Sequence, residues 1–169
     1  MTNDVIRMAA AVYMDTSTLM KNTNLINFLY QIEEKPQLII PGCVHERLVK
    51  MSEEDSDRGR QARDTLELTD ELYRTYFHVE QTAETSPLTF FLTKAEEKRY
   101  GLPILVLTQS AEMAHALEIR HAAGCKVTVK RLTAGGCPVN FDPDRLPAKI
   151  TALSDRTNAS AVLKMLIGS

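Results

Sequence analysis

The sequence of 169 residues has no tryptophan, only three cysteines, and no apolar run near the ~18 residues that a membrane-spanning helix needs. The cysteines are widely spaced and include no C-x-x-C pair, which argues against a disulfide framework and against a zinc cluster. The first four residues carry an acid where a signal peptide requires basic charge. We therefore expect a soluble, cytoplasmic protein with no membrane partner.

Several motifs that bind phosphate or carry a nucleophile are also missing. The chain contains neither G-x-G-x-x-G nor G-x-x-x-x-G-K-[ST], which argues against dinucleotide and P-loop sites. It contains no G-x-S-x-G, the turn that presents a hydrolase serine. Any chemistry must therefore come from residues outside these motifs.

The composition is that of a globular domain, with 44% hydrophobic and 25% charged residues. The charge is unevenly distributed. Residues 1–115 hold 12 basic and 18 acidic side chains, a net charge of −6, whereas residues 116–169 hold 8 and 4, a net charge of +4. An acidic metal-binding pocket beside a phosphate-tolerant surface explains this pattern, and an unevenly charged solvated surface explains it equally well.

Short apolar runs alternate with amphipathic segments along the chain. Residues 9–14, 38–40 and 104–107 are apolar on every side, which predicts strands buried on both faces, the second of them over residues 37–40. Helices are expected over residues 24–34, 44–51, 62–76, 88–100 and 112–123, with a loop or exposed helix start over 52–63. A short strand is expected at 77–79, an edge strand at 126–130, a hinge at 134–136, and short helices at 148–153 and 159–167.

This order predicts an α/β fold, a three-layer α/β/α sandwich around a mainly parallel sheet of four or five strands. We expect the domain to cover residues 1–132, followed by a helical extension over 133–169. In such sheets, sites form at the carboxyl ends of the strands.

Two acids follow the predicted buried strands. Asp15 comes directly after the first strand with Thr16 and Ser17, and this group predicts either a Mg²⁺ or Mn²⁺ site or the cap of the next helix. Glu46 lies early in the helix after the second strand, where it either points back toward Asp15 or is solvated or ion-paired.

The order of these elements resembles the PIN domain. A strand that closes in Asp15-Thr16-Ser17, an amphipathic helix, a second strand that closes in proline and Glu46 carry the resemblance, together with the strand that ends in Thr108. It covers roughly residues 12–132. PIN domains are α/β/α nucleases that cleave RNA with Mg²⁺ or Mn²⁺ held by three or four acids. The resemblance implies that Asp15 and Glu46 are metal ligands.

The sequence departs from the PIN pattern at two acids. The family usually ends the fourth strand in Thr-Asn-Asp, and here Ser110 stands in place of that Asp. The acid that the family carries near residues 89–90 is missing too, because no acid occurs between Glu84 and Glu96. Two carboxylates hold one Mg²⁺ only loosely, whereas metal-assisted hydrolysis often uses two ions ~4 Å apart.

We therefore expect a degenerate nuclease site in a protein that acts through RNA or protein binding, with no cofactor. The alternative is an active Mg²⁺- or Mn²⁺-dependent ribonuclease with an altered ligand set. In that case Asp15, Glu46 and Ser110 carry the catalytic roles, and Ser17, Thr108 or Ser110 orients metal-bound water.

Two further surfaces are candidates for partners. A basic strip would add phosphate contacts to those of Ser17 and Thr108, and it consists of Arg120, Lys126, Lys130 and Arg131. The apolar residues of the two C-terminal helices offer a surface for a protein partner or a second copy of the chain, or they pack on their own sheet.

Overall fold

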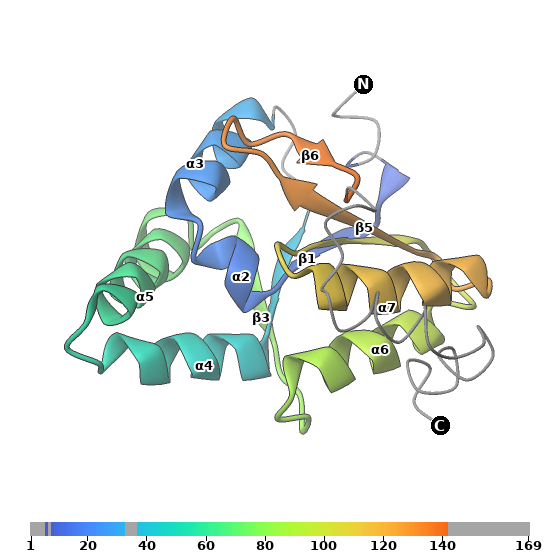
Figure 1. The fold of residues 1–169 in the computed structure, drawn as a ribbon, viewed down its shortest axis with the longest axis horizontal. Helices are drawn as coiled ribbons and strands as arrows, with labels where there is room; N and C mark the ends of the chain where they lie inside the picture. Colours follow the sequence, from blue (N-terminus) through green and yellow to red (C-terminus); the bar gives the residue numbers. More distant parts are fainter. Residues whose placement is uncertain (1–5, 7, 33–36, 142–169) are drawn as a thin grey trace, which may run out of the picture.

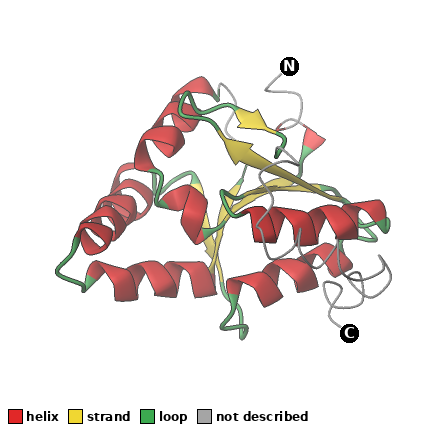
Figure 2. Ribbon diagram, in the orientation of Figure 1, coloured by secondary structure: helices red, strands yellow, loops and turns green. Residues whose placement is uncertain are grey.

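The computed structural model describes residues 6, 8–32 and 37–141, which form a three-layer α/β/α sandwich (Figure 1, Figure 2). The sheet has six strands in the order β3-β2-β1-β4-β5-β6. Strands β1 to β5 are parallel, and β6 is antiparallel to β5. The strands are β1 (Ala11–Met14), β2 (Leu38–Pro41), β3 (Phe77–Glu80), β4 (Ile104–Leu107), β5 (Val127–Leu132) and β6 (Pro138–Val139).

The three apolar runs of the sequence form the interior strands of the sheet. Every residue of β1, β2 and β4 is buried. In the register of the sheet, Val12 pairs with Leu38 on one side and Leu105 on the other. Strands that are covered by helices on both faces need apolar side chains at successive positions, and these three strands have them. The parallel sheet between two layers of helices confirms the predicted α/β fold.

Helices cover both faces of the sheet. Figure 1 shows α6 and α7 side by side on one face, with α3 and α5 on the other. The helices are α2 (Thr16–Leu19), α3 (Asn22–Gln31), α4 (Gly42–Ser52), α5 (Asp57–Glu67), α6 (Pro87–Glu97) and α7 (Ala111–Ala122), and a π-helix (Leu68–Leu72) extends α5. No helix in the described ranges is long and apolar enough to cross a membrane.

The last part of the sheet differs from the sequence-based expectation. The strand predicted at an edge is β5, and β6 pairs only with its last two residues, Arg131 and Leu132, which follow the predicted stretch 126–130. Strand β6 is too short to give a sequence pattern. Residues 134–136 are not a hinge but lie in the connection between these two strands, packed against α3. Gly136 has a φ of +82°, and a Cβ atom there would lie 2.2 Å from the backbone nitrogen of Phe28. The helices predicted at 148–153 and 159–167 lie outside the described residues.

The chain order reverses direction in the middle of the sheet. The segment after β1 leads to β2 on one side of it, whereas β4 lies on the other side of β1. The helices after β1 and β4 therefore leave toward opposite faces, which opens a crevice beyond the carboxyl ends of these two strands. Ligand sites in open α/β sheets form at this position.

Candidate functional site

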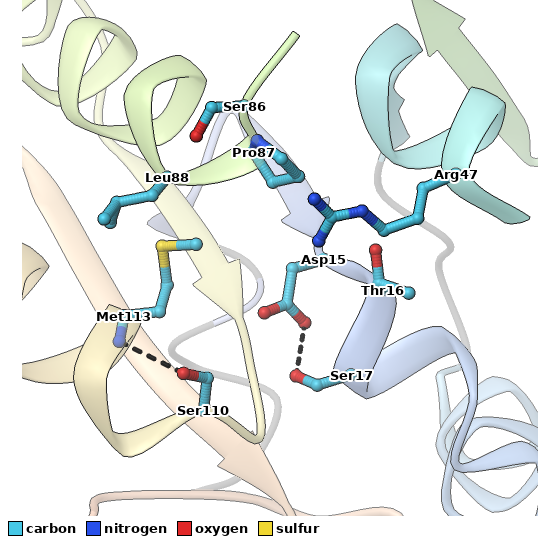
Figure 3. Close-up of a pocket in the computed structure, with 9 residues that line it drawn as sticks. All are labelled: Asp15, Thr16, Ser17, Arg47, Ser86, Pro87, Leu88, Ser110 and Met113. Atoms are coloured by element: carbon cyan, nitrogen blue, oxygen red, sulfur yellow. Dashed lines mark hydrogen bonds between the residues drawn. The ribbon is translucent and has the colours of Figure 1, made fainter. Parts of the chain in front are cut away.

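A cavity of about 260 Å³ lies at the carboxyl ends of β1 and β4 (Figure 3). Its walls come from the segment after β1, from α4, and from the N-terminal ends of α6 and α7. The lining residues are Asp15, Thr16, Ser17, Arg47, Ser86, Pro87, Leu88, Ser110 and Met113. The cavity thus occupies the crevice that the strand order creates.

Asp15 is the carboxylate of this cavity, and its side chain is held by the protein itself. It is the N-cap of α2, with Oδ1 accepting from the Thr18 backbone N–H at 3.0 Å and from the Ser17 hydroxyl at 2.7 Å. Oδ2 accepts from the Thr108 hydroxyl at the end of β4. Asp15 therefore joins β1, α2 and β4, and only 5% of the residue is exposed.

The hydroxyls that donate to Asp15 also fix the chain after β4. Ser17 Oγ accepts from the backbone N–H of Gln109 at 2.8 Å, and Thr108 Oγ1 accepts from that of Ser110 at 3.0 Å. Each hydroxyl thus donates its hydrogen to the Asp15 carboxylate and accepts a hydrogen bond from a backbone N–H. The result is a closed network that sets the shape of the cavity floor.

The carboxylate of Asp15 is stabilised by hydrogen bonds from neutral donors. Burial raises its pKa above the ordinary 3.8, and the hydrogen bonds from Thr108, Ser17 and Thr18 oppose this shift without cancelling it. In the described part of the chain, no Lys, Arg or His side chain forms an ion pair with Asp15.

Arg47 supplies the positive charge of the cavity. Its side chain extends from α4 over Asp15 and Thr16 (Figure 3). Within the described ranges, Arg47 forms no ion pair with a carboxylate. A guanidinium carries five N–H donors, so this group has hydrogen-bonding capacity beyond what the described residues take up. The neighbouring Thr16 hydroxyl oxygen is buried and has no partner among the residues described.

The opposite side of the cavity combines two serines with apolar side chains. Ser86 and Ser110 are the N-caps of α6 and α7, and their Oγ atoms accept from backbone N–H groups at 3.4 and 3.2 Å. Each hydroxyl keeps its own hydrogen for a further acceptor. Leu88 and Met113 lie beside these serines (Figure 3). The cavity thus has a polar side and an apolar side.

The structure brings together some of the predicted site residues but not all. Asp15, Ser17 and Ser110 line the cavity, and Thr108 contacts Asp15 from behind them. Glu46 is exposed and is not among the lining residues. The residue of α4 that faces the cavity is the next one along the helix, and neighbouring helix positions point about 100° apart. A single helix step thus places an arginine, rather than a second acid, opposite Asp15.

The predicted basic strip is not a continuous surface. Arg120 is only 5% exposed, and its Nε lies 3.2 Å from Oε1 of Glu96, so its charge is engaged inside the fold. Lys130 and Arg131 are neighbours in β5 and point to opposite faces of the sheet. Lys126 precedes that strand and is exposed. None of these four residues lines the cavity.

Arg47, Leu88 and Met113 line the cavity but were not predicted as site residues, whereas Thr16 was predicted beside Asp15. Ser86 also lines the cavity, and it lies just before the helix that the sequence predicts over residues 88–100. The position of Ser86 in the chain could have indicated its place in the site. A helix that connects β3 to β4 begins at the carboxyl edge of the sheet, where the cavity lies.

Fold and cavity together define an α/β/α protein with a polar site at the point where the strand order reverses. The sequence matches no family model, and a search of curated proteins gives no significant match. The functional argument therefore depends on the site itself.

Proposed function

We propose that this chain is a PIN-like domain that binds RNA without cleaving it. The observation that carries the proposal is the charge composition of the cavity, which has one carboxylate, Asp15, and one guanidinium, Arg47. Mg²⁺ requires near-octahedral oxygen ligands, and two-metal hydrolysis requires enough acids to neutralise two ions. This donor set fits such a centre poorly. Among the described lining residues Asp15 is the only carboxylate, it already accepts three hydrogen bonds, and the facing cation repels a metal.

The same residues favour an anionic ligand. Arginine is the side chain best suited to phosphate, because its planar donors match the phosphate oxygens. The Ser86 and Ser110 hydroxyls add neutral donors on the other side of the cavity. In the part of the chain that the structure describes, no aromatic side chain on which a base could stack lines the cavity, so contact with the RNA backbone is favoured over recognition of bases.

An assay that measures binding and cleavage together tests this proposal. A fluorescent single-stranded RNA is incubated in Mn²⁺ with the wild type, Asp15→Asn and Ser110→Asp, and anisotropy and fragment length are recorded. We expect the wild type to bind the RNA and leave it intact. Robust cleavage by the wild type that disappears in Asp15→Asn would instead establish the Mg²⁺- or Mn²⁺-dependent ribonuclease. A wild type that neither binds nor cleaves would contradict both functions and favour a protein partner.

A further inference from the structure

The cavity also indicates which part of the RNA it holds, an inference that rests on the proposed function. We infer that it takes a single nucleotide without a metal ion, with the phosphate on Arg47 and the sugar against Leu88 and Met113. The guanidinium then supplies the positive charge that a divalent ion supplies in a nuclease.

Arg47 is available to bind a ligand. It is the one cationic residue among those that line the cavity, and it has no carboxylate partner in the described ranges. Asp15, the nearby acid, has its oxygens directed toward Ser17, Thr18 and Thr108. These donors disperse its negative charge, which lowers its repulsion of a phosphate.

Neutral hydrogen-bond donors converge on the same cavity. Ser86 and Ser110 line the cavity, and the helices that they cap are 11 and 12 residues long. The N-terminal end of such a helix carries a partial positive charge and backbone N–H groups without helical partners. A phosphate in the cavity would thus meet one full charge and two helix ends.

The size and shape of the cavity limit its occupant. About 260 Å³ is less than the ~300–1,000 Å³ of common small-molecule pockets, which limits the occupant to about one nucleotide. Leu88 is 43% exposed at the rim and Met113 is 7% exposed deeper inside, so apolar surface is available beside the polar donors. Aliphatic side chains can contact a sugar, but they do not select one base. We expect weak discrimination among the four nucleotides.

The test is calorimetric titration of the full chain with uridine 5′-monophosphate, uridine and inorganic phosphate, all in EDTA. We expect the monophosphate to bind and uridine not to bind. Arg47→Gln should weaken binding by about tenfold or more, because a charged hydrogen bond is lost. Lys50→Gln is the matched control, since it removes the same charge from an exposed position of α4 that does not line the cavity, and it should bind like the wild type.

A substitution of Leu88 tests whether the sugar lies against the apolar side of the cavity. Leu88→Ala should weaken binding of uridine 5′-monophosphate severalfold and leave the affinity for inorganic phosphate unchanged. Equal weakening of both ligands would contradict the placement of the sugar against this side chain.

Two outcomes would overturn the inference as a whole: binding of the monophosphate only when Mn²⁺ is added, or binding that Arg47→Gln leaves unchanged. The inference and the proposed function fail separately. If RNA binds and the monophosphate does not, the inference is wrong and the proposed function stands. If the monophosphate binds through Arg47 and RNA does not, RNA binding is wrong and the phosphate site stands.

Discussion

Two cavities at the carboxyl edge of the sheet contain acids and a cation, but they use these charges differently. Beside β3 and α6, a cavity of about 190 Å³ is lined by Glu80, Glu97 and Lys94 among others. Lys94 Nζ lies 3.0 Å from Oε2 of Glu80 and 3.2 Å from Oε2 of Glu97. In the cavity beyond β1 and β4, Arg47 and Asp15 face the same space without forming an ion pair.

The difference separates a structural cluster from a candidate binding site. Burial lowers the pKa of Lys94, but its bonds to Glu80 and Glu97 outweigh this effect and raise the pKa. At Asp15 burial is the largest effect and raises the pKa, and among the described residues only neutral hydrogen-bond donors oppose it. Charged groups that pair with each other within the fold have few donors left for a ligand. The guanidinium of Arg47 has no carboxylate partner among the described residues, so it is available to an anion.

The largest effect on stability should follow the removal of Asp15. Asp15→Ala leaves the Ser17 and Thr108 hydroxyls and the Thr18 N–H without their acceptor in a buried place. We expect the free energy of unfolding to fall by about 2–4 kcal/mol, measured by urea denaturation. Glu97→Ala in the other cavity removes an exposed acid and should cost about 1 kcal/mol or less. Equal losses of unfolding free energy for Asp15→Ala and Glu97→Ala would contradict the difference between the two cavities.

Removing the cation from each cavity, Lys94 from one and Arg47 from the other, compares their contributions to stability directly. Lys94→Met leaves Glu80 and Glu97 without their cation, and we expect a loss of about 1 kcal/mol in the free energy of unfolding. Arg47→Met removes a charge with no acid partner in the described ranges, so its effect should stay within about 0.5 kcal/mol. A larger loss for Arg47→Met than for Lys94→Met, in parallel urea titrations, would show that Arg47 is structural.

Two substitutions of Ser110 distinguish its role as the N-cap of α7 from its role in ligand binding. Ser110→Ala removes the acceptor for the Met113 N–H and should cost about 1 kcal/mol of the free energy of unfolding. Ser110→Asp keeps a capping oxygen and should retain stability close to that of the wild type, but its added negative charge should weaken binding of uridine 5′-monophosphate. Thermal unfolding and calorimetry on both variants measure the two roles. Tighter monophosphate binding by Ser110→Asp would contradict an anion site.

The smallest effect is a pH dependence that comes from Asp15. Because burial raises its pKa in the folded state, the folded chain binds this proton more tightly than the unfolded chain. Its contribution to the free energy of unfolding should therefore decrease as the pH rises from the ordinary pKa of 3.8 through the raised value, and then stay constant. The difference between wild type and Asp15→Asn, measured across this range, should show that slope. A slope of the opposite sign would mean that the hydrogen bonds outweigh burial.

The parts of the fold with strong local patterns could be predicted from the sequence. The interior strands β1, β2 and β4 are continuous apolar runs, so both their positions and their burial follow from the residues. Strand β6 has two residues and depends on the partner β5 for its conformation, so it has no pattern of its own. Arg120 is a charged helical residue, a type that is usually exposed, and its burial depends on contacts with a distant helix.

The site was predictable where it follows a strand directly. Asp15 and Ser110 come immediately after or close behind buried strands, so the topology alone brings them to one edge. Whether Glu46 or Arg47 faces that edge depends on how α4 is rotated on the sheet, and the amphipathic pattern does not fix this to within one residue. That one-residue difference changes the predicted ligand from a metal ion to a phosphate.

The most direct test of a metal-free phosphate site is a crystal of the protein soaked with Mn²⁺ and uridine 5′-monophosphate together, with data collected at the manganese absorption edge. We predict electron density for the phosphate against Arg47 and no anomalous peak at Asp15. An Mn²⁺ ion coordinated by Asp15, with the phosphate bound to that ion, would contradict the account and restore the nuclease interpretation.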